Sequence, residues 1–174
     1  MHMPKLAIAA AILTTTAAVV YAAAPAPTDP QIAHIAYTAG ALDVTAAKQA
    51  LKKTHNPKVR AFAETMVRDH DAVNAKALAL VKKLGVTPQP NPTSTALSQA
   101  AAKEMKVEAR LSGVAFDRAY LKNEVAYHRT VNDALRTTLI PSAHNAELKS
   151  LLQTGLTLFG EHQQHAEMLA KAIG

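Results

Sequence analysis

The sequence predicts an all-α protein in which four long helices form an up-and-down bundle of two antiparallel hairpins. Its hydrophobic content is 49%, supplied mainly by Ala, Leu and Val, while aromatic residues make up only 4%. Ala and Leu favour helices, and the shortage of aromatic residues argues against a sheet. Apolar residues also recur at alternating intervals of three and four over Val59–Leu84, the spacing of a helix that faces a bundle core. At 174 residues, the chain is long enough for one domain.

Residues 1–24 have the features of a signal peptide, which leaves a single helical domain over residues 25–174. Lys5 gives a positively charged start, Leu6–Val20 is uncharged and apolar, and small residues at 22–24 suit cleavage. The apolar stretch is short for a membrane span. We therefore expect a protein exported to the periplasm or secreted, with an uncleaved anchor as the alternative. The chain has no cysteine, which excludes disulfides, a lipid-modified cysteine and thiolate metal ligands.

The first hairpin is predicted from its start and stop signals. Thr28, followed by Asp29-Pro30, indicates a helix start, and this helix is expected to run to about Lys53. The segment 55–57 (His-Asn-Pro) breaks it and begins a second helix that runs to Leu84 and stops at Gly85. Because three residues join the two helices, they must lie antiparallel.

The second half of the chain is predicted to contain three more helices. A Pro-rich crossover over residues 86–95 leads to a short extra helix at about residues 94–111. The fourth helix is expected over residues 116–139, closed by Pro141, and the fifth over residues 145–173. The two long helices of this half form the second hairpin, with the crossover and short helix between the hairpins.

The chain carries a formal net charge of +6, concentrated on the first hairpin. Nine basic and five acidic residues lie between Asp29 and Leu84. The basic residues follow helical intervals without interleaved aromatic residues, which is typical of a solvated outer face. We therefore expect no nucleic-acid partner. An anionic surface or another protein of the cell envelope stays a candidate partner.

Histidines occupy positions where these helices should place apolar core residues. In the seam of the second helix, His70 is the one polar member, and burying an imidazole costs free energy unless a hydrogen bond, a charge or a metal satisfies it. Helical bundles build metal sites from inward carboxylates and histidines, which suit zinc, copper, iron or manganese. The candidate ligands are Asp43, His70, Glu124, His128, His162 and His165.

Counting residues from the turns tests whether these side chains can meet. Asp43 and His70 lie at nearly equal distances from the first turn, so we expect them at one level. His128 lies eleven residues before the expected helix end, whereas His162 lies seventeen after the next helix begins. This offset corresponds to roughly 9 Å and argues against one site that uses every candidate.

Structural roles are the alternatives for the same residues. His70 could be a core histidine that bonds to Asp43, His128 and Glu124 could form an intrahelical pair, and one of His162 and His165 could lie at the edge. Asp69 is expected to face solvent. The pattern lacks the paired Glu-x-x-His motifs of di-iron oxidases. Because the sequence also shows no catalytic nucleophile or acid–base dyad, we lean against an enzyme.

Three motifs in order resemble the bacterial domain-of-unknown-function family 4142. They are MVRDH (Met66–His70), FDRAYLKNEVAYH (Phe116–His128) and HQQHAEML (His162–Leu169), and GALDVTAAKQAL (Gly40–Leu51) is also similar. The resemblance implies an exported, ferritin-like bundle without an established activity. The family's characteristic polar positions fall on Asp43, Asp69, His70, Asp117, Tyr120, His128 and His162. Asp43 stands where the family usually has Glu, which shortens the reach of this carboxylate.

Two functions follow as hypotheses. The first is an exported ferritin-like protein that binds a transition metal through core histidines and carboxylates, in a sequestering or stress-related role. The second is a non-catalytic structural or protein-interaction module of the cell envelope. A contiguous exposed apolar patch would favour the second.

Overall fold

The computed structural model describes residues 25–173, and in this range the chain is all-α, as predicted. The predicted signal peptide lies outside the described residues. The elements in chain order are α1 (Asp29–Lys53), α2 (Pro57–Lys83), α3 (Pro92–Glu108), α4 (Gly113–Ala134), the π-helical turn η1 (Leu135–Leu139), α5 (Ile140–Ser142) and α6 (Ala146–Ile173). Among the described helices, none combines the length and apolar character that crossing a membrane requires.

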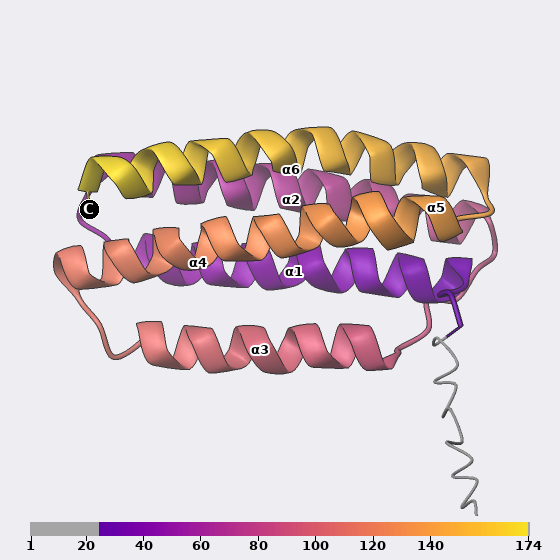
Figure 1. Ribbon diagram of the computed structural model, residues 1–174, viewed down its shortest axis with the longest axis horizontal. Coiled ribbons are helices and arrows are strands. Elements are labelled where there is room, and N and C mark those ends of the chain that lie inside the picture. The colour runs from indigo at the N-terminus through magenta and orange to yellow at the C-terminus, as the bar shows by residue number, and fades with distance from the viewer. Residues whose placement is uncertain (1–24, 174) are drawn as a thin grey trace, which may run out of the picture.

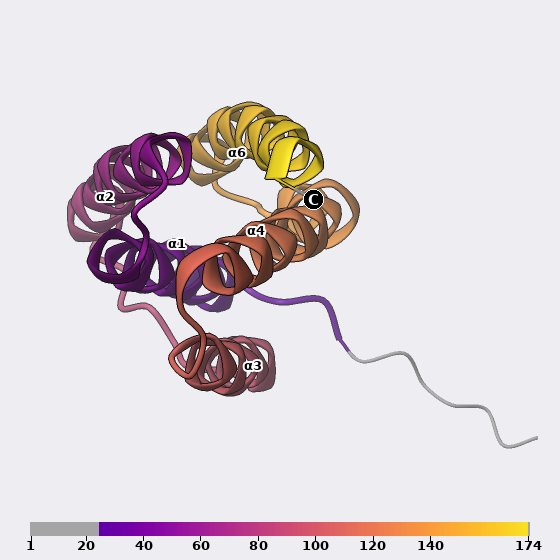
Figure 2. The same ribbon diagram turned by 90° about the vertical axis from the view of Figure 1, so that its left-hand side faces the viewer.

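Four of the helices, α1, α2, α4 and α6, pack around a common core, and α3 lies outside it (Figures 1 and 2). α1 packs mainly on α2, and α4 mainly on α6, so that each of the two predicted hairpins is present. α2 also contacts α6, and α1 contacts α4. α3 packs against α1 and, less extensively, against α4.

Local capping explains where the helices of the first hairpin begin and end. The side chain of Asn56 accepts hydrogen bonds from the amides of Lys58 and Val59, at 2.9 and 3.5 Å, and so satisfies amides that a helix start leaves free. α2 ends at Gly85, whose φ of 62° is the left-handed conformation that glycine adopts at little cost. The carboxylate of Asp29 accepts from the amides of His144 and Asn145, which ties the start of α1 to the loop before α6.

Two predicted boundaries are wrong. α3 begins at Pro92, so the crossover ends at residue 91 and not at 95, because Asn91 and Ser94 cap the helix reciprocally. The fourth helix begins at Gly113 and continues through η1 and α5 to Ser142. Pro141 therefore lies inside the final turn and not beyond the helix end, shortly after the π-helical turn, where the backbone has already left the regular α-helical pattern of hydrogen bonds.

The core consists of two apolar clusters separated along the helices by a band of polar residues. One cluster contains Phe62, Met66, Phe116, Tyr120 and Leu121. The other contains Ile32, Leu135, Leu139, Leu148, Leu152 and Phe159. On each of α1, α2, α4 and α6, at least one buried polar residue lies between the positions that contribute to the two clusters: Asp43, His70, Glu124 with His128, and His162. The fold thus brings four helices together around one polar level.

Candidate metal centre

Each of the four core helices supplies a buried polar side chain at this level. Asp43 comes from α1, His70 from α2, Glu124 and His128 from α4, and His162 from α6, and all are at least 96% buried. Side chains with ionisable groups are rarely buried this deeply without a partner. The helical periodicity that buries apolar neighbours on both sides therefore also places these groups at the centre of the core.

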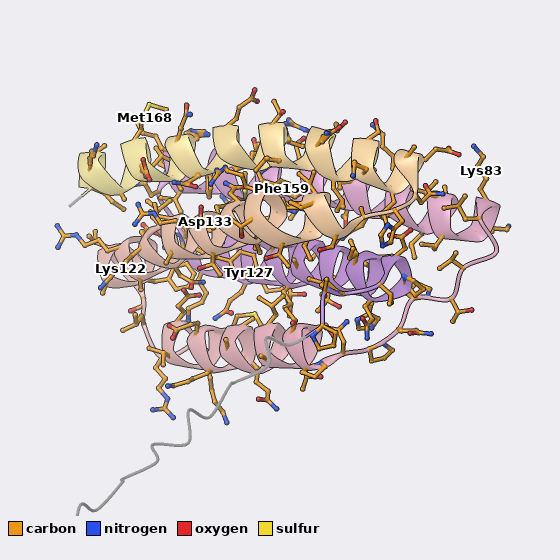
Figure 3. All side chains as sticks on the ribbon, turned by 45° about the vertical axis from the view of Figure 1, so that its right-hand side comes forward. Lys83, Lys122, Tyr127, Asp133, Phe159 and Met168 are labelled. Carbon is orange, nitrogen blue, oxygen red and sulfur yellow. The ribbon has the colours of Figure 1, made fainter. Side chains whose placement is uncertain are left out.

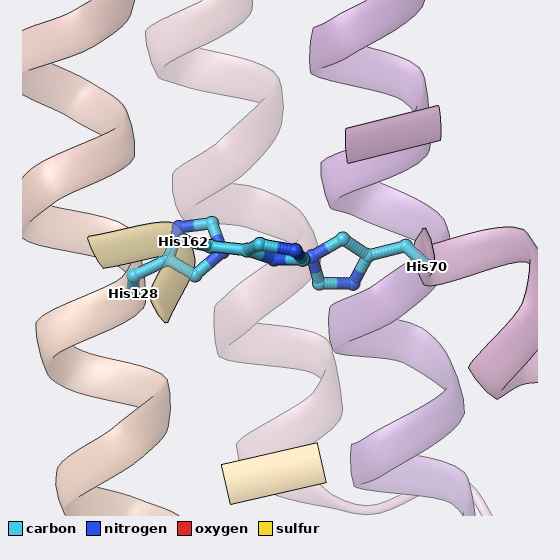
Figure 4. A group of neighbouring side chains, drawn as sticks. All are labelled: His70, His128 and His162. Atoms are coloured by element: carbon cyan, nitrogen blue, oxygen red, sulfur yellow. The ribbon is translucent and has the colours of Figure 1, made fainter. Parts of the chain in front are cut away.

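His70, His128 and His162 form a compact triad across the helical core (Figure 4). The ring centroids are 5.6 Å apart for His70 and His128, 5.3 Å for His70 and His162, and 5.5 Å for His128 and His162. One ring nitrogen of each histidine lies within 4.8 Å of the others. The expected offset between His128 and His162 is therefore wrong, and the three rings lie at one level.

The carboxylate of Asp43 lies against two of these rings. Its Oδ2 atom is 3.4 Å from Nε2 of His70 and 3.5 Å from Nε2 of His128. None of these three atoms has a hydrogen-bond partner. In a tetrahedral centre with metal–ligand bonds of about 2.1 Å, neighbouring ligand atoms are about 3.4 Å apart. The spacing therefore matches the edges of a metal coordination polyhedron.

Two of the histidines are fixed by a hydrogen bond from their other ring nitrogen. Nδ1 of His128 donates to the backbone carbonyl of Glu124 at 3.0 Å, because a carbonyl can only accept. Nε2 of His162 donates to the carboxylate of Asp69 at 3.0 Å. These bonds leave Nε2 of His128 and Nδ1 of His162 without a hydrogen, and both atoms are buried and unpartnered. Such outer hydrogen bonds are typical of histidines that bind a metal.

His70 is oriented by an aromatic side chain. The ring of Phe159 on α6 stacks on His70 with a centroid distance of 4.5 Å and an interplanar angle of 10°. Neither nitrogen of His70 has a hydrogen-bond partner. Phe159 lies near the middle of the helical core (Figure 3) and closes one side of the triad with an apolar face. His70 is thus held by packing alone.

Burial sets the protonation of the triad. Desolvation, with smaller contributions from the neighbouring histidines, lowers the pKa of His70 to about 2 and that of His128 to about 4. Desolvation also lowers the pKa of His162, although Asp69 opposes this effect. The imidazoles are therefore neutral at neutral pH, which is the form that binds metal ions. Burial raises the pKa of Asp43, since a carboxylate without a cation is costly in the core.

Further buried acidic side chains lie beside Asp43, on the side of the core that faces α3. Glu124 has an unpartnered Oε2 that lies 3.4 Å from Nδ1 of His128, and Asp43, Glu124 and His128 form a second group able to hold a cation. The hydroxyl of Tyr120 and both carboxylate oxygens of Glu108 are likewise buried and unpartnered. Burial raises the pKa of Glu124 and raises that of Glu108 to about 7. Oxygen ligands are thus available beside the histidines.

A family model described as "Domain of unknown function (DUF4142)" matches residues 14–169. The chain belongs to the DUF4142 family. The predicted resemblance is thereby confirmed over most of the sequence. No curated protein and no solved structure matches the chain.

In this DUF4142 protein, an unexpected helix end explains why the two histidines meet. The π-helical turn and α5 extend the fourth helix to Ser142, and α6 begins at Ala146. His128 lies fourteen residues before Ser142 and His162 sixteen residues after Ala146, so the offset shrinks to about 3 Å. The wider π turn also adds a residue with little axial rise.

Two other predictions differ from the observed positions. His165 joins neither of the two groups, and its ring contacts Phe62 edge-on at 5.2 Å. Asp69 does not face solvent, because it bonds to His162 and to Arg68. The motif MVRDH, which contains Asp69, was the signal in the sequence that could have identified Asp69. Phe159, which stacks on His70, was not among the predicted site residues.

Proposed function

We propose that this protein is an exported, ferritin-like four-helix bundle that binds one transition-metal ion. The ligands are His70, His128 and His162, with Asp43 as the fourth. The role is sequestration, in metal storage or in the response to metal or oxidative stress, within the periplasm or outside the cell.

The observation that carries this proposal is the convergence of unpartnered ligand atoms in a dry core. Oδ2 of Asp43 and Nε2 of His70 and His128 are buried at coordination spacing, yet no hydrogen bond joins them. A buried polar atom without a partner costs about 1–3 kcal/mol. One cation would satisfy all of these atoms, together with Nδ1 of His162, at the same time.

The set of donors supports a borderline transition metal. Imidazole suits zinc, copper and iron, and a carboxylate suits manganese, whereas calcium and magnesium prefer sites built wholly of oxygen atoms. Three imidazoles and one carboxylate therefore favour zinc, copper(II), iron(II) or manganese. Because cysteine is absent from the chain, thiolate competitors for the ion are absent as well.

The number of protein ligands supports binding over catalysis. Catalytic zinc sites keep a position open for water or substrate, whereas structural sites are closed by four protein ligands. His70, His128, His162 and Asp43 provide four donors, and each is at most 4% exposed. A closed, dry site of this kind supports a sequestering role.

Metal content of the untagged protein tests the proposal. After incubation with each candidate metal and removal of the excess, elemental analysis should find about one ion per chain in the wild type. His70→Gln and His128→Gln should lose most of it, because each substitution removes an imidazole ligand. His165→Gln is the matched control and should keep the wild-type content, since His165 belongs to neither group.

Wild-type protein that retains far less than one ion would overturn the proposal. Unchanged content in both His70→Gln and His128→Gln would do the same.

The alternative function, an interaction module, receives less support. In the part of the chain that the structure describes, five large apolar side chains are at least 36% exposed, one on each of five helices. They are Tyr37, Leu78, Val107, Val114 and Met168. A binding surface for a protein partner is instead expected as a contiguous patch.

A further inference from the structure

A cavity between α1, α3 and α4 reaches the buried centre from one side. Its volume is about 200 Å³, and it touches Asp43 and Glu124 at its inner end. Ala101 and Glu104 contribute to its wall from α3. Figure 3 shows side chains that extend between α3 and α4, with Tyr127 on the α4 side. The cavity between α1, α2 and α6 is smaller, about 40 Å³, and includes none of the proposed ligands.

The cavity is acidic although the protein is basic. Its lining includes three carboxylate side chains, those of Asp43, Glu104 and Glu124, and no Lys, Arg or His. The whole chain, in contrast, has 19 basic and 13 acidic residues. A cleft lined by one sign of charge concentrates ions of the opposite sign. The exposed Glu104 therefore favours cations over anions at the outer end, while Asp43 and Glu124, which burial holds neutral, offer oxygen ligands at the inner end.

The proposed metal centre needs such a route. His70 and His128 are 3% and 1% exposed, and Asp43 is 2% exposed. An ion cannot reach these atoms from solvent unless a path leads to them or a helix moves. The cavity supplies the path, because its inner end is formed by Asp43 itself.

α3 is the wall of the cavity that is best suited to move. Its buried residues are only Ser94 and Glu108. Its hydrogen bonds to α1 lie at its two ends. At the start, the side chain of Asn91 donates to the backbone carbonyl of Gln31 at 3.3 Å, and at the other end Gln49 and Lys53 donate to backbone carbonyls of α3 and its C-cap at 3.0 and 2.9 Å. A helix with few buried apolar side chains opens at low free energy. The alanine-rich middle of α3 is therefore free to shift away from the cavity.

Glu108 gives a second observation on the same helix. It lies one turn after Glu104, is 2% exposed and has two unpartnered carboxylate oxygens. It lies one turn beyond the residues by which α3 lines the cavity. A buried carboxyl without a partner is unfavourable. α3 therefore carries one exposed acid on the cavity wall and one buried acid next to it.

We propose that the cavity between α1, α3 and α4 is the access route for a divalent cation, with Glu104 as its outer acidic residue and α3 as its movable wall. This inference rests on the proposed metal centre. The cation meets Glu104 first, passes Glu124, and then reaches Asp43 and the histidines.

Rates of cobalt(II) uptake and release test the route. Uptake is followed by the visible absorption of the bound ion after rapid mixing, and release by transfer to excess EDTA. Ala101→Phe fills the cavity and should slow both rates by about tenfold or more, while the Kd stays within about twofold, because the barrier and not the site changes. Ala102→Phe, which places the same ring on the exposed face of α3, is the matched control and should keep wild-type rates.

Glu104→Gln provides a variant that cannot disturb the core, because Glu104 is exposed. It should slow uptake about threefold at low salt and weaken the dependence of the uptake rate on salt. Glu64→Gln removes an exposed carboxylate on α2 and should change neither quantity.

The two proposals fail in different ways. Equal uptake and release rates in wild type, Ala101→Phe and Glu104→Gln, with a normal Kd, would overturn the route and leave the metal centre standing. A weaker Kd with unchanged uptake in Ala101→Phe would also overturn the route. No cobalt binding by the wild type would remove the metal centre, and the route with it.

Discussion

The two halves of the buried polar band differ in how their side chains are supported. On the histidine side, each ring has a fixed orientation, set by Asp69 for His162, by the Glu124 carbonyl for His128 and by Phe159 for His70. On the carboxylate side, Glu124 and Glu108 have carboxylate oxygens without any hydrogen-bond partner. The difference indicates that the histidine half is organised in advance for an ion, whereas the carboxylate half is held neutral by burial until a cation arrives.

Among changes that leave all four proposed ligands in place, removing the outer partner of a histidine should have the largest effect on metal binding. In Asp69→Asn, His162 loses the carboxylate that fixes its tautomer, so metal affinity should fall about 10–100-fold, as measured by competition with a chelating indicator. Asp71→Asn changes an exposed neighbour on the same helix and serves as the control. Equal affinities in the two variants would show that the Asp69–His162 bond does not organise the site.

The carboxylate half should make the free energy of unfolding of the metal-free protein depend on pH. Burial raises the pKa of Glu108 to about 7, so the folded state binds this proton more tightly than the unfolded state. The resulting stability is fully present below the unfolded pKa of about 4.5 and is lost as the pH rises through 7. Glu108→Gln has no such proton to lose. Its free energy of unfolding should match the wild type at pH 4.5 and exceed it by about 2 kcal/mol at pH 8.

Denaturant unfolding at the two pH values measures this difference. A constant difference between Glu108→Gln and the wild type at both pH values would show that Glu108 is not held protonated by burial.

Substitutions of two buried phenylalanines distinguish an effect on the metal centre from an effect on core packing in general. Phe159→Leu and Phe116→Leu each remove a buried ring, so both should lower the free energy of unfolding by about 1–2 kcal/mol. Only Phe159 stacks on His70, and therefore only Phe159→Leu should also weaken metal affinity, by about threefold. Thermal unfolding and metal titration of the two variants make the comparison. A similar loss of affinity in Phe116→Leu would assign the effect to packing alone.

Local signals in the sequence were sufficient for most of the fold. Proline, asparagine and glycine mark the helix ends directly, and the short connection between α1 and α2, predicted at 55–57 and observed at 54–56, fixes the antiparallel course of the first hairpin. The same short connection allowed Asp43 and His70 to be placed at one level, and the structure brings them to 3.4 Å. These features depend on neighbours in the chain, which is why sequence reasoning reached them.

The missing parts of the site depend on contacts between distant segments. The π turn at Leu135–Leu139 shifts His128 relative to α6, and no short-range signal predicts it. Asp69 lies one residue before His70 and outside the seam of α2, so it was expected to face solvent. In the structure, α6 brings His162 within hydrogen-bond distance of it. Phe159 was missed for a similar reason, since its stacking on His70 joins α6 to α2 and spacing within one helix does not reveal such a contact.

X-ray absorption spectroscopy of the metal-loaded protein tests the central claim most directly, because it reports the ligands of the bound ion. The account predicts four nitrogen or oxygen ligands at about 2.0–2.2 Å for zinc, with outer scattering from three imidazoles that falls to two in His70→Gln. An ion surrounded by oxygen ligands without imidazole scattering, or a spectrum that His70→Gln leaves unchanged, would contradict it.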